Sequence, residues 1–231
     1  MALTRYQKIQ QVLSKRQPDL TLCLDEVHKH HNVSALVRTA DAVGVHAIHS
    51  VWPKGERFVT TTTSTSGGSK NWVENHRYDD VTGAITTIRQ QIPDVQVIAT
   101  HFCDQAVDFR EIDYTKPTAI VLGQEKIGIS EQALAMADQH IIIPMVGMVQ
   151  SLNVSVAGAL ILYEAQKQRQ EAGMYHDNQL PEAIKHRLLF EGCHAKVAQQ
   201  CQRKGIAYPM LDSDGEIMAD QTFWDSLRYA D

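Results

Sequence analysis

The sequence predicts a mainly parallel α/β sheet with helices on both faces. From residue 20 to about residue 165, short β-rich runs alternate with helical stretches. This alternation is typical of parallel sheets, because neighbouring parallel strands need a crossover connection that is usually a helix. With 231 residues and 43% hydrophobic content, the chain is long enough for one sizeable core plus appendages rather than two full domains.

Several segments of this region have the pattern of a strand or a helix. Short apolar runs rich in β-branched residues predict strands at residues 20–24, 47–52, 95–100, 118–122 and 140–143. Apolar residues three to four positions apart predict helices at residues 33–43, 80–91, 130–137 and 154–170. The polar, threonine-rich run at residues 60–65 is expected to be an exposed loop.

Basic charge gathers towards both ends of the chain, although the net charge is −5. Residues 1–18 are expected to form a basic amphipathic helix that ends at Gln17-Pro18. Residues 173–231 are expected to be helical and polar, with Pro181 placed to begin a helix, and they end in an acidic tail. Local patches rather than total charge set phosphate affinity, so the pattern fits either nucleic-acid contacts or solvated helix faces.

The composition predicts a cytoplasmic protein. The longest apolar runs are far too short to span a bilayer, and the polar N-terminus lacks the apolar segment of a signal peptide. The four cysteines lie far apart and form no C-x-x-C pair, which favours isolated thiols in a reducing compartment over disulfides or a zinc site. We therefore expect no membrane association and no metal.

The first segment with chemical potential surrounds the start of the helix at residues 33–43. Asn32 follows a predicted strand and suits the N-cap of this helix. Arg38 lies six residues further on, less than two helical turns away, so both side chains can face the crevice at the end of the strand. A salt-bridged surface arginine is the alternative interpretation.

The second segment is a buried strand that leads into a glycine turn and a helix start. Gly123 and Gly128 have the G-x-x-x-x-G spacing of a phosphate-binding loop. Ile129 stands where that loop needs a lysine to reach the terminal phosphates, which argues against a Walker-type NTPase. The loop presents Glu125 instead, and a purely structural turn is the alternative.

The third segment joins a buried strand to a helix through an apolar, methionine-rich loop. The strand ends at Pro144, and residues 151–153 start a helix whose early positions are small. Small residues let a ligand approach the backbone closely, and Met145 and Met148 can cover a flat apolar ring such as adenine. Core packing of the methionines is the alternative.

Together, the three segments resemble the signature motifs of the SPOUT superfamily of RNA methyltransferases. The patterns are N-x-x-x-x-x-R-T, L-G-x-E-x-x-G-I and I-P-M-x-G-x-x-x-S-L-N-V-S-V-A, in that order. The resemblance is greatest to the TrmH branch, the tRNA (guanosine-18-2′-O)-methyltransferases, and it covers nearly the whole chain. The combination of the three patterns is more specific than any one of them.

The resemblance implies a fold, a reaction and a domain organisation. A deep trefoil knot is expected near the C-terminal part of the catalytic domain, in a homodimer. The implied reaction transfers a methyl group from S-adenosyl-L-methionine to the 2′-hydroxyl of guanosine 18 in the D-loop of tRNA. The implied segments are a basic N-terminal extension (1–18), a catalytic domain (19–172) and a C-terminal RNA-binding extension (173–231).

The resemblance also implies roles for single residues. The catalytic set is Arg38, Asn32, Ser151, Asn153 and Glu125. The cofactor is expected to sit bent within the knot, held mostly by backbone groups of Thr100, His101, Leu122, Gly123, Glu125, Ile143, Met145, Ser151 and Leu152. RNA contacts are expected from Arg5, Lys8, Arg16 and Arg38. Because a guanidinium is a poor base at neutral pH, we favour Arg38 as a partner of the substrate phosphate and of developing alkoxide over a general base.

Three rival functions are open. The histidines at positions 28, 30, 31, 46 and 49 suggest a metal hydrolase, but the first three lack the helical pairing and acidic partner of a zincin, which favours a solvated loop. A noncatalytic RNA-binding protein with the same fold is the second rival, and the complete catalytic set argues against it. The third keeps the chemistry and acts on ribosomal RNA.

Overall fold

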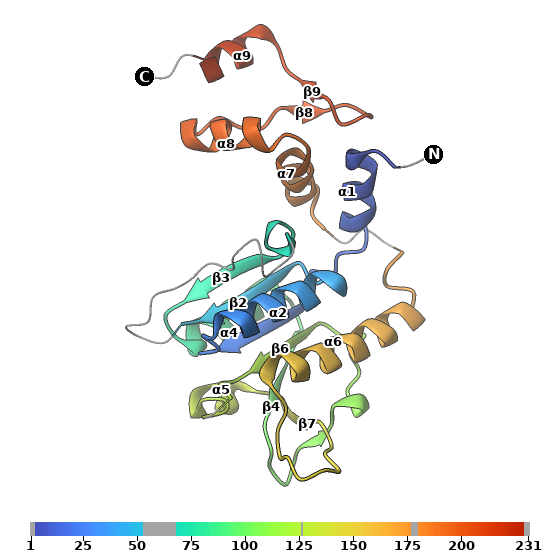
Figure 1. The fold of residues 1–231 in the computed structure, drawn as a ribbon, viewed down its shortest axis with the longest axis vertical. Helices are drawn as coiled ribbons and strands as arrows, with labels where there is room; N and C mark the ends of the chain where they lie inside the picture. Colours follow the sequence, from blue (N-terminus) through green and yellow to red (C-terminus); the bar gives the residue numbers. More distant parts are fainter. Residues whose placement is uncertain (1–2, 53–67, 126, 177–179, 229–231) are drawn as a thin grey trace. The chain divides into compact units, whose positions relative to one another are not determined.

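The computed structural model describes residues 3–52, 68–125, 127–176 and 180–228. The chain divides into two compact units, one of residues 17–176 and the other of residues 1–16 together with 177–231. Both are drawn in Figure 1. Of the helices within the described ranges, none combines the length and the hydropathy needed to cross a membrane.

A seven-stranded sheet forms the centre of the larger unit (Figure 1). Its order is β3-β2-β1-β6-β4-β7-β5, and every hydrogen-bonded pair is parallel. The strands are β1 (Leu20–Asp25), β2 (Ala47–Val51), β3 (Glu74–Tyr78), β4 (Gln96–Thr100), β5 (Val107–Asp108), β6 (Thr118–Leu122) and β7 (Gln139–Ile142). The predicted mainly parallel α/β sheet is therefore confirmed.

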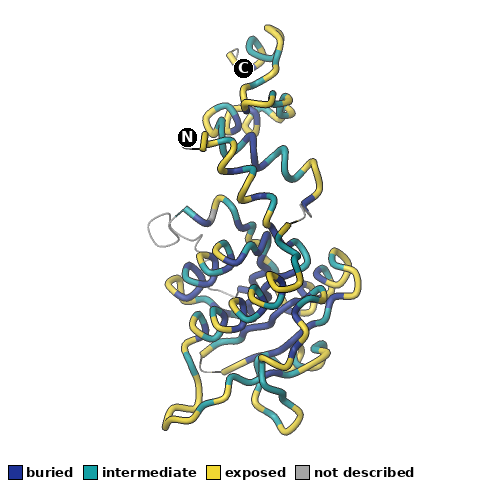
Figure 2. Tube along the Cα trace, turned by 90° about the vertical axis from the view of Figure 1, so that its right-hand side faces the viewer, coloured by how far each residue is buried: buried dark blue, intermediate teal, exposed yellow. Residues whose placement is uncertain are grey.

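Helices cover both faces of this sheet. One layer contains α2 (His30–Ala42) and α6 (Val154–Glu171), and the other contains α4 (Val81–Gln91) and α5 (Glu131–Met136). Successive strand residues point to opposite layers, so Leu22 and Leu24 pack with α2 and α6 while Cys23 packs with α4 and α5. Figure 2 shows the result, with buried strands between helices whose outer faces are exposed.

The predicted strands correspond to β1, β2, β4, β6 and β7, and the predicted helices to α2, α4, α5 and α6. The prediction missed β3 and β5. β3 has the polar sequence ENHRY and only half-buried or exposed residues, and β5 is two residues long. Two short 3-10 helices, η1 (Ser69–Asn71) and η2 (Phe109–Glu111), are the other elements in the described part of the unit. The threonine-rich run at residues 60–65 lies outside the described residues.

The start of α2 differs from the prediction. The helix begins at His30, its N-cap is Lys29, and no side chain caps it. Asn32 therefore lies inside the first turn, where it is 2% exposed, and the prediction that it caps the helix is wrong. His30 and His31 belong to the same turn rather than to a solvated loop, although both are exposed.

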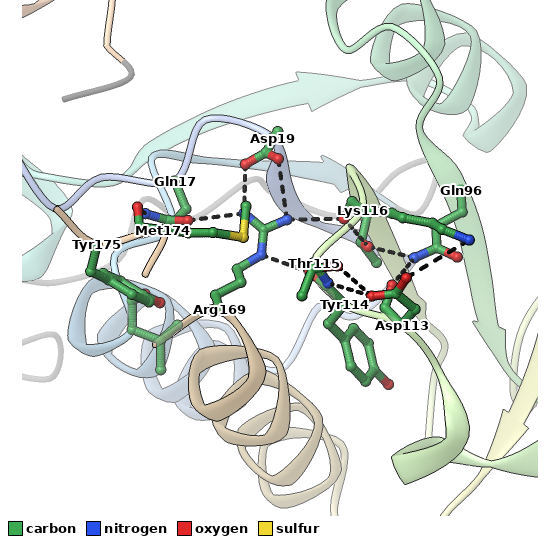
Figure 3. A network of polar contacts seen from close by, with 12 residues as sticks. Gln17, Asp19, Gln96, Asp113, Tyr114, Thr115, Lys116, Arg169, Met174 and Tyr175 are labelled. Carbon is green, nitrogen blue, oxygen red and sulfur yellow. Dashed lines mark hydrogen bonds and ion pairs between the residues drawn. The ribbon is translucent and has the colours of Figure 1, made fainter. Parts of the chain in front are cut away.

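A buried arginine joins the end of α6 to the loops that lead into β1 and β6 (Figure 3). Arg169 has no exposed surface. Its guanidinium donates to the carbonyl oxygens of Tyr114 (2.9 Å) and Lys116 (3.0 Å), to the side-chain oxygen of Gln17 (3.0 Å) and to the carboxylate of Asp19 (2.6 Å). Two chain segments at the amino ends of the strands, residues 17–19 and 114–116, are thus held by one cation.

We expect Arg169→Met to lower the free energy of unfolding by about 3–5 kcal/mol, because it leaves buried acceptors and a carboxylate without their donor. Lys167→Met on the same helix is the matched control, since that ammonium is exposed and its ion pair with Glu164 is long, at 4.0 Å. The control should cost under about 1 kcal/mol. Urea unfolding followed by circular dichroism measures both, and equal effects of the two substitutions would contradict the assigned role.

In the smaller unit, the two ends of the chain fold together. Its elements are α1 (Arg5–Leu13), α7 (Glu182–Cys193), α8 (Ala195–Lys204), β8 (Met210–Leu211), β9 (Ile217–Met218) and α9 (Gln221–Arg228). Helix α1 packs against α7, where Nε of Arg5 donates to the carbonyl of Gly192 (2.7 Å). The ring of Tyr6 covers Gly215 so closely that a β-carbon there would lie 2.5 Å from it.

Two predictions for this unit are wrong in detail, and one is confirmed. Helix α1 ends at Leu13, short of Pro18, and the region expected to be helical contains the antiparallel hairpin β8–β9. The hairpin turn is stabilised by the carboxylate of Asp212, which accepts from the N–H groups of Asp214 (2.9 Å) and Glu216 (2.8 Å). Pro181 does stand at the N-cap of a helix, α7.

Candidate active site

A cavity of about 970 Å³ opens at the carboxyl ends of β4, β6 and β7. This is the edge of a parallel sheet at which ligands of α/β proteins usually bind. The segment from Pro144 to Val154, which connects β7 to α6, forms much of its wall. The cavity brings together every residue predicted to bind the cofactor: Thr100, His101, Leu122, Gly123, Glu125, Ile143, Met145, Ser151 and Leu152.

The backbone of residues 144–152 is available to a ligand. Within the described part of the chain, no residue forms a backbone hydrogen bond with it. Peptide N–H and C=O groups need partners when water is excluded, so a ligand in the cavity can satisfy several of them at once. This fits the expectation that backbone groups hold the cofactor.

The loop after β6 is a tight turn rather than a phosphate cradle. The N–H of Gln124 donates to the carbonyl of Gly128 (3.0 Å), and the N–H of Gly128 donates back to the carbonyl of Gln124 (2.8 Å). A β-carbon on Gly123 would lie 2.2 Å from the Gly128 carbonyl oxygen, so only glycine fits. The closed turn explains the glycine spacing, and it presents Glu125 at the cavity.

Glu125 joins the three sequence motifs. Its Oε1 accepts from Nδ2 of Asn32 (2.9 Å) and from Nδ2 of Asn153 (2.7 Å), and its other oxygen pairs with Lys29. Nδ2 of Asn153 also donates to Oδ1 of Asn32 (3.1 Å), while Oδ1 of Asn153 caps α6 by accepting from the N–H of Ser155 (2.9 Å). Three of the predicted catalytic residues therefore form one network.

Lys29 is the member of this network that the sequence analysis missed. In the sequence, Lys29 stands out only as a basic residue three positions before Asn32. The hydrogen bond from Lys29, and next that from Asn32, hold the pKa of the Glu125 carboxyl below its ordinary value. The carboxylate thus stays ionised at neutral pH as an acceptor for both amides.

The other predicted site residues lie apart from the network. Ser151 is exposed and lines the cavity. Arg38 is exposed on α2 and lines no described cavity, because six residues place it roughly 120° around the helix from the buried Asn32. Asn32 and Arg38 thus do not face one crevice. Arg5 and Lys8 are exposed, whereas Arg16 is fully buried, a position that does not suit the predicted RNA contact.

Comparison with known proteins identifies the family. Residues 19–163 match the model of the SpoU rRNA Methylase family, and residues 167–220 match that of the C-terminal region of SpoU rRNA methylases. The chain belongs to the SpoU methylase family. The resemblance to RNA methyltransferases noted in the sequence is therefore confirmed.

Individual relatives of this SpoU methylase include both tRNA and rRNA methyltransferases. The tRNA (guanosine(18)-2′-O)-methyltransferase of Escherichia coli strain K12 is 56% identical over 229 residues, 98% of both chains. The TrmH/SpoU tRNA modifying enzyme of A. aeolicus is 40% identical, with a TM-score of 0.76 over 84% of this chain and 96% of that one. The AdoMet-bound rRNA methyltransferase from Sinorhizobium meliloti is 31% identical, with a TM-score of 0.58 over 67% and 59%.

The histidines considered as metal ligands do not converge in this family member. Among the described residues, no group of three His, Cys, Asp or Glu side chains is placed to hold a metal. His49 is buried in β2, and its Nδ1 lies 3.0 Å from the hydroxyl of Tyr78. Burial, and to a lesser extent His76, lower the pKa of His49 to about 4, so its ring is neutral at neutral pH. The burial and the contact with Tyr78 are those of a structural histidine.

We expect Lys29→Met to raise the pKa of Glu125 towards its ordinary value, because the ammonium stabilises only the ionised carboxylate. A carboxyl carbon titration by NMR measures this shift. Lys116→Met removes an exposed lysine that pairs with Asp113 and should leave Glu125 unchanged. An unchanged Glu125 titration in Lys29→Met would show that the ion pair does not control this carboxylate.

Proposed function

We propose that this SpoU methylase transfers a methyl group from S-adenosyl-L-methionine to the 2′-hydroxyl of guanosine 18 in the D-loop of tRNA. The observation that carries the proposal is the meeting of three motifs, through Asn32, Glu125 and Asn153, at the edge of one large cavity. The name of the E. coli relative, which matches along 98% of the chain, supports the choice of substrate and position.

The cavity fits S-adenosyl-L-methionine. Its volume of about 970 Å³ is within the range of about 300–1,000 Å³ of sites for small ligands. Leu122, Ile141 and Ile143 give it an apolar wall for an adenine ring, and residues 144–152 offer peptide groups that have no backbone partner among the described residues. When bound, the cofactor supplies a methyl group activated by a sulfonium centre. The S. meliloti neighbour, solved with AdoMet, supports the assignment.

The chain's own residues then position the acceptor. The ionised Glu125 and the two asparagines fix a polar wall beside the cofactor cavity, and near-attack positioning can contribute about 7–11 kcal/mol to a two-reactant step. Arg38 is exposed outside this cavity, which fits contact with a phosphate of an approaching RNA better than a role as general base. The 2′-hydroxyl itself distinguishes RNA from DNA.

The terminal segments are proposed to bind the body of the tRNA. Residues 1–16 and 177–231 of these segments form the smaller unit, in which Arg5 and Lys8 are exposed on α1. Cations on such a unit can hold phosphates outside the active site. Arg16 is left out of this set, because its side chain is fully buried.

A second candidate substrate is ribosomal RNA. The family model is that of rRNA methylases, and the S. meliloti neighbour is an rRNA methyltransferase. The fold, the cofactor and the roles of Asn32, Arg38, Glu125, Ser151 and Asn153 would stay as proposed, and only the acceptor would change.

The trefoil knot and the cytoplasmic location are also proposals. Family membership supports a knot in the stretch where β7 continues through residues 143–153 into α6. A tRNA substrate supports the cytoplasm.

We propose a homodimer, because α6 has an exposed apolar face. Val156, Leu160 and Tyr163 follow one another at helical spacing and are 47%, 42% and 54% exposed. Val146, Met148 and Val149, in the loop before this helix, are also exposed. Contiguous exposed apolar surface of this kind is typical of a protein–protein interface.

Leu160→Glu is expected to shift the protein from dimer to monomer, because it places a charge in the apolar face. Gln90→Glu, on the exposed side of α4 in the opposite layer, is the control and should remain dimeric. Sedimentation velocity at several concentrations measures both. A dimeric Leu160→Glu variant would place the interface elsewhere.

The function is tested by transfer of tritiated methyl groups to unmodified tRNA transcripts, with nucleoside mass spectrometry of the product. We expect 2′-O-methylguanosine at position 18, and a loss of at least about 100-fold in Arg38→Ala, as for removal of a group that stabilises developing charge. Arg38→Lys keeps the positive charge but should not retain full activity if the guanidinium fork is required. Arg89→Ala, on α4, is the arginine control.

Each other outcome of this assay has one meaning. Label in ribosomal RNA alone would replace the tRNA substrate by the second candidate. Binding of the cofactor without transfer to either RNA would overturn the enzymatic proposal in favour of a noncatalytic RNA-binding protein.

A further inference from the structure

A smaller cavity of about 170 Å³ adjoins the proposed cofactor cavity. Gln124, Glu125 and Val154 line both cavities, so the two share a wall. The smaller volume is below the roughly 300–1,000 Å³ of sites for complete ligands, and it suits one part of a nucleotide. Because a methyl group passes directly from donor to acceptor, the acceptor nucleotide must lie against a wall of the cofactor cavity, and this space does.

Glu26 lines the smaller cavity with an unusual backbone. Its φ is 56°, in the left-handed region that side-chain-bearing residues rarely adopt. The carbonyl oxygen of Glu26 accepts from Nδ1 of His28 (2.9 Å), which helps to hold this conformation. Strained residues of this kind cluster at ligand sites, where the surrounding structure maintains them for their position.

Glu26 and Gln124, which both line the cavity, carry side-chain oxygens that can accept further hydrogen bonds. Nε2 of Gln124 donates to Oε2 of Glu26 (2.6 Å), which fixes the two side chains relative to each other. Within the described part of the chain, nothing donates to Oε1 of Glu26 or to the side-chain oxygen of Gln124. Two neighbouring acceptors match an edge that carries two neighbouring donors.

Guanine has such an edge, in its N1–H and its 2-amino group. Adenine has an acceptor at N1 and no 2-amino group, so the same two oxygens would face a lone pair. A site whose polar groups are left unpaired by the wrong ligand discriminates strongly. Reading the Watson–Crick edge of an unstacked base is the usual route to specificity in single-stranded RNA.

We propose that the smaller cavity receives the guanine of the acceptor nucleotide and that Glu26, held by Gln124, selects guanine through its N1–H and 2-amino groups. This inference rests on the proposed function and names the residues that choose its base. The ribose then lies at the shared wall, beside Glu125.

A double-mutant cycle, with one change in the enzyme and one in the tRNA, tests the inference. Two tRNAs are compared, one with guanosine at position 18 and one with inosine, which lacks only the 2-amino group. We expect the wild type to show about a 10- to 100-fold lower kcat/KM on the inosine tRNA, as for loss of a hydrogen bond to a charged group. The kcat/KM of Glu26→Ala on the guanosine tRNA should fall by a similar factor. Its kcat/KM values on the two tRNAs should differ by less than about 3-fold, because neither complex then has the interaction.

Asp94→Ala is the matched control. Asp94 is also acidic, also has a φ of 56°, and lines neither cavity. The ratio of its kcat/KM on the guanosine tRNA to its kcat/KM on the inosine tRNA should equal the wild-type ratio. Calorimetry should show unchanged S-adenosyl-L-methionine affinity in Glu26→Ala. If Glu26→Ala folds poorly, Glu26→Asn replaces it, since asparagine tolerates the left-handed region and its shorter side chain withdraws the acceptor.

The results separate this inference from the function on which it rests. An active Glu26 variant that keeps the wild-type guanosine-to-inosine ratio would overturn the guanine site and leave the methyltransferase standing. A wild type that methylates neither tRNA would overturn both.

Discussion

The active-site edge of this protein depends on the hydrogen bonds that meet at Glu125. Asn32 and Glu125 are 93 positions apart in the sequence, and Asn153 follows 28 positions after Glu125. They meet because β1 and β6 are parallel neighbours, with Leu24 beside Leu122, so the segments that follow the two strands emerge together. Removing the carboxylate would leave the buried Asn32 amide without this acceptor.

The third member of the network reaches Glu125 because two helices approach closely. Gly158 of α6 faces α2, and a β-carbon there would lie 2.5 Å from Leu36 and 3.0 Å from Leu122. This contact sets the first turn of α6 against the strand end, where the N-cap Asn153 can reach both partners. At the opposite end of the same sheet, Arg169 fixes the loops that enter β1 and β6. One end of the sheet is thus held for stability and the other presents polar groups.

Periodicity predicted most of the sheet and its helices, because their apolar residues recur with the spacing that burial requires. It failed where burial is partial, as in the polar edge strand β3, and where the element is only two residues long, as in β5. It also failed at Asn32, because the capping rule is local and the amide instead has a distant acceptor in Glu125. That the three motifs share one site came from a family resemblance, since no local pattern states which strands lie side by side. Lys29 and Glu26 give almost no sequence signal, because an ion pair and a left-handed φ arise only in the folded chain.

The charges of the site indicate how it can accept part of a polyanion. The described residues that line the smaller cavity include the carboxylates of Glu26 and Glu125 and one ammonium, that of Lys29, already paired with Glu125. Such walls attract neutral groups with N–H or O–H donors, and they repel phosphate. On the proposed function, the base and the hydroxyl therefore enter, while phosphates stay outside with cations such as the exposed Arg38. A net charge of −5 is then compatible with RNA binding, because the acidic groups select the nucleotide and separate basic groups hold the backbone.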